Sequence, residues 1–286
     1  LSGNETNNFC PLQGDDSTGT VKIFWTISVK TMQAPIIPRR TAIIVDATDS
    51  LPPTAKDMLS AQFKLQYTSG LNGQQWQSNL HNYEKVSIYE LKESVVALGK
   101  PSFEMCAPIH NAVNVWTDNQ RKRVQVFRNK FTSKIEEYIA KLVVQPERDR
   151  SPIMETISQI AKNNDRIFIV SDMMEHASGS CSLYSTTRHD YDKLAGRDCA
   201  GFSAASLAGK DIHVLLVLRN KLRYQQNPAL VEFWETHFSK RGAKVSFEVL
   251  GDIPTSCKGS PDPVGCSVCL APGFIENHQY CPDAAG

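Results

Sequence analysis

Short apolar segments alternate along the chain with longer amphipathic ones. The first, Thr41–Val45, is almost wholly apolar and is short enough for a buried strand. Further strands of this kind are predicted over residues 84–91, 102–105, 166–171, 212–218 and 243–250. Because strands that alternate with helices are typical of parallel sheets, we predict a doubly wound α/β domain with a mostly parallel sheet flanked by helices.

The longest amphipathic segment lies between residues 118 and 142. Its apolar residues recur at intervals of three and four, which is one face of a helix over several turns. They are Val124, Phe127, Phe131, Ile135, Tyr138 and Leu142. This face is expected to pack against the sheet.

Three more helices are predicted between the strands. One follows Pro52-Pro53. The next begins at Ser151-Pro152, with Ser151 as the N-cap and Pro152 at the first helical position. The last spans residues 228–240. The inward faces of these last two helices carry Ile153, Ile157 and Ile160 in the first, and Leu230, Phe233, Trp234 and Phe238 in the second.

The predicted domain covers only part of the chain. Residues 1–40 form an N-terminal arm, residues 41–250 form the α/β domain, and residues 251–286 form a tail rich in Cys, Pro and Gly. Within the domain, residues 173–209 lack periodicity and are interpreted as a long surface excursion near the carboxyl edge of the sheet.

Charge and hydropathy exclude two classes of partner. The chain has 31 Lys and Arg residues against 30 Asp and Glu residues, a net charge of +1, so no overall field favours nucleic acid or an anionic membrane. No apolar run approaches the roughly 18 residues that would suggest a transmembrane helix. Nucleic acid is therefore not expected as a partner, and no membrane span is expected within this chain.

Hydroxyl and carboxylate side chains gather at predicted strand ends. Asp46, Thr48 and Ser50 follow the first strand, Asp172 ends the strand at 166–171, and Ser151 opens a helix. Open α/β sheets bind ligands at this edge, and such oxygens suit Mg²⁺ or Mn²⁺ better than zinc. The alternative is that these residues only cap helices and turns.

The same residues resemble the metal-ion-dependent adhesion site of von Willebrand factor A (VWA) domains. The first motif of that family is Asp-x-Ser-x-Ser, and Asp46, Thr48 and Ser50 match it with Thr in place of the first Ser. Ser151 stands where the family has a loop Thr, and Asp172 matches the final acid. The resemblance implies a non-enzymatic module in which a bound divalent cation engages an acidic group of a protein partner.

Several segments also resemble a bacterial group of VWA-like proteins whose biochemical role is unassigned. The likeness runs in order over about residues 10 to 250 and has no counterpart in the tail. The segments are Cys10–Leu12, Ala47–Asp49, Ser151–Glu155, Val170–His176, Ser182–Tyr184, Glu232–Trp234 and Gly242-Ala243. This resemblance supports the fold more than it supports a function.

The chain has eight cysteines, and four of them lie in the tail: Cys257, Cys266, Cys269 and Cys281. Disulfides are favoured over a zinc site for these four, although Cys266-x-x-Cys269 followed by His278-x-x-Cys281 has a spacing that could bind Zn²⁺. Cys10 with Cys106, and Cys181 with Cys199, are the other pairings considered. An even, dense set of cysteines favours an extracytoplasmic location, whether periplasmic, at the cell surface or secreted.

Two other functions compete with metal-dependent adhesion. A structural subunit of a larger assembly, with a vestigial metal site, would use the arm, the long loop and the tail for contacts. A phosphatase resembling the haloacid-dehalogenase group would use Asp46 as the nucleophile and Asp172 to hold Mg²⁺. That chemistry usually needs a second acid beside Asp172, whereas Ser171 and Met173 flank it.

Overall fold

The computed structural model of the chain describes residues 39–46, 48, 51, 55–57, 59–60, 84–91, 100–107, 120–141, 150–177, 181–184, 193, 206–222 and 225–250. Within them lie six strands: β1 (Arg40–Asp46), β2 (Lys85–Leu91), β3 (Phe103–Cys106), β4 (Arg166–Ser171), β5 (Asp211–Val217) and β6 (Lys244–Leu250). The main helices are α3 (Gln120–Lys141), α4 (Ile153–Ile160) and α6 (Pro228–Lys240), with short 3₁₀ turns at Ala161–Asn163 and Asn220–Leu222.

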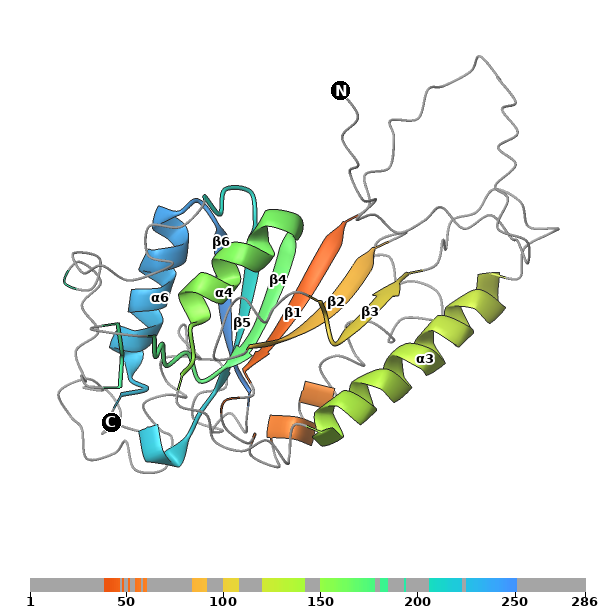
Figure 1. Cartoon of the computed structure of the whole chain (residues 1–286), viewed down its shortest axis with the longest axis horizontal. Helices are drawn as coiled ribbons and strands as arrows, with labels where there is room; N and C mark the ends of the chain where they lie inside the picture. The colour runs from red at the N-terminus through yellow and green to blue at the C-terminus, as the bar shows by residue number, and fades with distance from the viewer. Residues whose placement is uncertain are drawn as a thin grey trace, which may run out of the picture.

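The six strands form one sheet in the order β3-β2-β1-β4-β5-β6 (Figure 1). In this order β2, β1, β4, β5 and β6 run parallel to one another. β3 is the exception, because it pairs antiparallel with β2 at one edge. This confirms the predicted doubly wound, mostly parallel α/β fold. β1 lies between β2 and β4, so the chain builds outward in both directions from β1.

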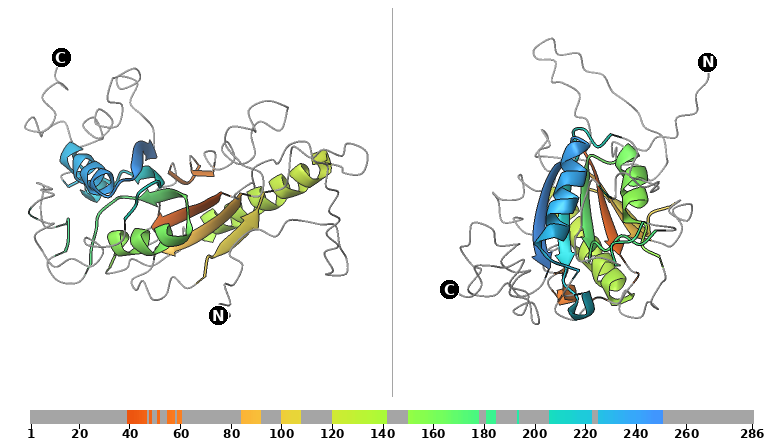
Figure 2. Two further views of the ribbon diagram at one scale, coloured as in Figure 1. Left: turned by 90° about the horizontal axis from the view of Figure 1, so that it is seen from above. Right: turned by 90° about the vertical axis from the view of Figure 1, so that its left-hand side faces the viewer.

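The helices cover the two faces of the sheet separately (Figure 2). On one face α3 packs Phe127, Phe131 and Ile135 against the side chains of β1 and β2. On the other face α4 and α6 form a second core with β4 and β5, and Trp234 is its largest fully buried side chain. Since consecutive strand residues point to opposite faces, Ile43 and Ile44 belong to different cores.

The predicted helix at 151 begins later and is capped differently. α4 starts at Ile153, its N-cap is Pro152, and no side chain of its own caps it. The prediction that Ser151 is the N-cap is therefore wrong, because its hydroxyl is engaged elsewhere. Instead the carboxyl group of Glu175 accepts a hydrogen bond from the backbone N–H of Met154 at 2.9 Å. The inward positions predicted for α4 and α6 are buried, as expected.

The interpretation of residues 173–209 as a surface excursion is wrong for half of its described part. Met173, Met174 and Leu183 are 0 to 1% exposed, and Leu207 is 1% exposed. These residues pack into the core with α4 and α6. The error arose because a buried segment whose backbone is irregular shows neither helical nor strand periodicity.

Other predictions lie partly or wholly outside the described residues. The arm before residue 39 and the tail after residue 250, with its four cysteines, are among them.

Cys106 and Cys181, the two cysteines within the described residues, are both disulfide-bonded. Among the helices of the described residues, none combines the length and the apolar character needed to cross a membrane.

Candidate functional site

The carboxyl ends of β1 and β4 lie side by side at the centre of the sheet. β1 pairs with β4 up to Val45 and Val170, so Asp46 and Ser171, the last residues of these two strands, are neighbours. The strand order reverses at this point, since β1 is followed by strands on one side and β4 begins the other half. Doubly wound sheets bind their ligands outside the strand ends at such a reversal.

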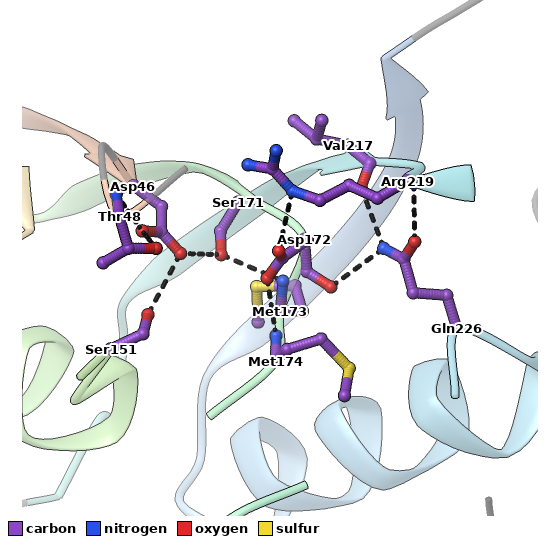
Figure 3. A network of polar contacts seen from close by, with 10 residues as sticks. All are labelled: Asp46, Thr48, Ser151, Ser171, Asp172, Met173, Met174, Val217, Arg219 and Gln226. Atoms are coloured by element: carbon purple, nitrogen blue, oxygen red, sulfur yellow. Dashed lines mark hydrogen bonds and ion pairs between the residues drawn. The ribbon is translucent and has the colours of Figure 1, made fainter. Parts of the chain in front are cut away.

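The carboxylate of Asp46 is the centre of a buried hydrogen-bond network (Figure 3). Its Oδ1 accepts bonds from the backbone N–H of Thr48 at 3.1 Å and from the Thr48 hydroxyl at 2.6 Å. Its Oδ2 accepts bonds from the hydroxyls of Ser151 at 3.1 Å and Ser171 at 2.7 Å. Three hydroxyl groups therefore converge on one carboxylate that is only 1% exposed.

Three of the five predicted metal ligands thus come together. Thr48 and Ser151 both contact Asp46, although Ser151 is 105 residues away in sequence. Ser50 lies outside the described residues. Asp172 is next to this cluster in the chain but takes part in a second network.

Backbone pairing holds Ser151 at the site. Its N–H donates to the carbonyl of His176 at 2.8 Å, and the N–H of His176 donates back to the carbonyl of Ser151 at 2.9 Å. His176 also pairs with Ser182, and its Nδ1 lies 3.0 Å from the Ser182 hydroxyl. The loop after β4 therefore positions the Ser151 hydroxyl, and His176 serves as a hydrogen-bonded structural residue.

Asp172 is held by a buried arginine. Its Oδ2 accepts a bond from Nε of Arg219 at 2.8 Å, and its Oδ1 accepts one from the backbone N–H of Met174 at 3.0 Å. The side chains of Arg219 and Asp172 are 7% and 1% exposed. Charge-assisted hydrogen bonds of this kind are among the stronger ones in proteins, so this carboxylate is firmly held.

Gln226 ties this ion pair to the end of β5. Its side-chain nitrogen donates to the carbonyls of Asp172 at 3.1 Å and Val217 at 2.8 Å. Its side-chain oxygen accepts from the backbone N–H of Arg219 at 2.7 Å. One amide thus joins the ends of β4 and β5 to the segment that leads into α6.

Sequence reasoning missed Ser171, Arg219 and Gln226. Ser171 had a visible signal, since it is the last residue of a predicted strand and directly precedes Asp172. Arg219 and Gln226 had none, because their separations from Asp172, 47 and 54 residues, follow no motif. Only the parallel pairing of β4 with β5 brings Arg219 to Asp172.

The donor set around Asp46 fits a hard cation. A hydroxyl that donates its proton to Asp46 keeps lone pairs for a metal, and one carboxylate with hydroxyl groups suits Mg²⁺ or Mn²⁺. Asp172 fits less well as a ligand, because the guanidinium of Arg219 already compensates its charge. Within the part of the chain that the structure describes, no cluster of three or more His, Cys, Asp or Glu side chains could hold a metal.

Comparisons with known proteins add little to this geometry. No family model matches the chain, and no curated protein matches it. Among solved structures, the human COPII-coat protein Sec24c aligns with 74% of this chain at 10% identity and a TM-score of 0.31. The alignment covers 30% of the Sec24c chain, so this chain spans under a third of that length. At this TM-score the similarity carries no argument about function.

Proposed function

We propose that the chain is a non-enzymatic, VWA-like protein-binding module whose partner docks at the carboxyl edge of the sheet. A divalent cation, Mg²⁺ or Mn²⁺, is held by the hydroxyls around Asp46, and an acidic group of the partner completes its coordination. Ser50 is proposed as a further ligand from the sequence pattern. The observation that carries this proposal is the convergence of Thr48 and Ser151 on one buried carboxylate.

The type of donor favours binding over hydrolysis. Neutral hydroxyl ligands leave the charge of a divalent cation largely uncompensated, so the cation attracts a carboxylate from outside the protein. The same cluster is less suited to a phosphatase nucleophile. Each oxygen of Asp46 already accepts two hydrogen bonds, and the residue is 1% exposed, so the carboxylate is poorly placed to attack a substrate.

A second candidate is a metal-independent structural subunit of a larger assembly. The observation that favours it is the Arg219–Asp172 ion pair, because the guanidinium already compensates the charge of one predicted metal ligand. The disulfide bonds at Cys106 and Cys181 support a location outside the reducing cytoplasm for either candidate function.

Calorimetric titration with Mn²⁺ and Mg²⁺ tests the first candidate. Asp46→Asn should abolish cation binding, because the neutral amide attracts no cation and its NH₂ group cannot accept the Ser and Thr hydroxyl hydrogens. Asp165→Asn is the matched control, since it makes the same change on a half-exposed acid that follows α4 and precedes β4, at the opposite edge of the sheet. Circular dichroism would establish that both variants are folded.

Partner capture provides the second measurement. Proteins retained by the immobilised chain in Mg²⁺ should be released by EDTA, and Asp46→Asn should not retain them. Unchanged cation affinity in Asp46→Asn would contradict the proposed cation site. Retention that resists EDTA and survives Asp46→Asn would favour the metal-independent assembly.

A further inference from the structure

The two acids predicted as metal ligands differ in their surroundings although they lie at neighbouring strand ends. Asp46 receives hydrogen bonds from neutral groups, one of them the Ser171 hydroxyl at 2.7 Å. Asp172, the next residue, is paired with the guanidinium of Arg219. Figure 3 shows the Asp46 carboxylate beside Ser171, and the Arg219 guanidinium beside Asp172.

This arrangement sets the charge available to a cation. Asp46, Asp172 and Arg219 together carry two negative charges and one positive charge, so they attract a divalent cation with a net charge of only −1. The number of charged ligands is a main determinant of the affinity of an oxygen site for a divalent cation. The guanidinium is also nearly buried, so solvent screens its repulsion of a second cation only weakly.

We infer that Arg219 is an internal cation that competes with a divalent metal for Asp172 and thereby holds the metal affinity of this edge low. The inference rests on the proposed function, since it concerns the cation site around Asp46. It makes Arg219 the residue that decides whether the module engages its partner through a metal. A chain with Arg219 uses one acid for the metal, and a chain without it uses two.

The fold contains a matched ion pair at the amino ends of the strands, opposite the ends that carry Asp46 and Asp172. Arg166 donates to Glu84 at 2.8 Å, and their side chains are 9% and 0% exposed. Distance and burial thus resemble those of Arg219 and Asp172. Arg166 begins β4, whereas Asp172 follows its last residue, so the two pairs are at the two ends of one strand.

The test is Mn²⁺ titration by calorimetry on the full chain and on Arg219→Gln. The variant frees Asp172, and we expect its Mn²⁺ affinity to rise roughly tenfold or more. The thermal midpoint should also rise more on Mn²⁺ addition than it does in the unaltered chain. The double variant Arg219→Gln with Asp172→Asn replaces one neutral pair by another, so its affinity should return to the unaltered level.

Two further variants separate this role from a structural one. Arg166→Gln breaks the matched pair and should reduce stability without raising Mn²⁺ affinity. Arg219→Lys keeps the positive charge, so its Mn²⁺ affinity should stay near that of the unaltered chain. If Arg219→Gln does not fold, Arg219→Met decides, and a Mn²⁺ affinity equal to that of the unaltered chain would overturn the inference.

The inference is also overturned if Arg219→Gln folds and binds Mn²⁺ no more tightly, or if Arg166→Gln gains as much. Retention of the gain in the double variant would overturn it as well, since Asp172 would not be the acid released. Failure of the proposed function looks different. In that case Asp46→Asn and the unaltered chain would bind Mn²⁺ alike, while a gain in Arg219→Gln would still support competition at Asp172.

Discussion

The indole nitrogen of Trp234 donates a hydrogen bond to the backbone carbonyl of Met173 at 2.8 Å. Met173 has a φ of 60°, a left-handed conformation that is uncommon for any residue other than glycine. The Met173 N–H also donates to the Ser171 hydroxyl at 2.9 Å. These two bonds hold the bend at which the chain passes from Ser171, which faces Asp46, to Asp172, which faces Arg219.

Trp234→Phe removes the bond to the Met173 carbonyl while keeping an aromatic ring in the core. We expect a loss of about 1–3 kcal/mol in the free energy of unfolding, because a buried carbonyl loses its partner. Urea denaturation measures this loss. Amide exchange at Met174 should also become faster, whereas in Phe238→Leu, which perturbs the same core without this bond, it should change only with overall stability.

Two glycines with positive φ should respond differently to alanine. Gly209 has φ +73° with no atom within 4 Å of an added Cβ, whereas at Gly242, with φ +86°, the Cβ would lie 3.2 Å from Cα of Ala208. Gly209→Ala should cost about 1–2 kcal/mol from the backbone conformation alone. Gly242→Ala should cost more, because its added Cβ would crowd a backbone atom of Ala208, which moves less easily than the end of a side chain. Equal thermal midpoints for the two variants would contradict this difference.

Glu175 should make stability depend on pH. Burial raises the pKa of its carboxyl from 4.5 to about 8, with smaller contributions from Asp46 and Glu155. The folded protein therefore holds a proton that the unfolded chain releases, so this contribution to stability is complete below pH 4.5 and is lost as pH rises toward 8. The slope approaches about 1.4 kcal/mol per pH unit in that window.

Glu175→Gln should flatten the dependence of unfolding free energy on pH between 4.5 and 8. A glutamine oxygen can still accept from the Met154 N–H, so the start of α4 should be retained. Urea denaturation at several pH values compares the two chains. A variant whose stability still falls with the same slope would show that another group binds the proton.

The predicted strands and helices agree with the structure where they fall on described residues, apart from shifts of one residue at their ends, because their periodicity reflects burial directly. Phe127, Phe131 and Trp234 are buried as their spacing indicated. The cap of α4 was predicted wrongly. Local sequence shows a serine before a helix, but it does not show that the hydroxyl of this serine donates a hydrogen bond to a carboxylate far away in the sequence. Ser151 bonds to Asp46 instead, and Glu175 accepts from the helix.

The sequence by itself determined the layered α/β architecture and the acids and hydroxyls that close β1 and β4, since strand period and strand-end chemistry are local properties. It also determined that Asp46, Thr48 and Ser151 were candidates for one cluster. Only the tertiary structure decided that Asp172 is paired with Arg219, because parallel pairing of β4 with β5 joins residues that no spacing rule connects. Which charges meet at the sheet edge is therefore a consequence of strand order.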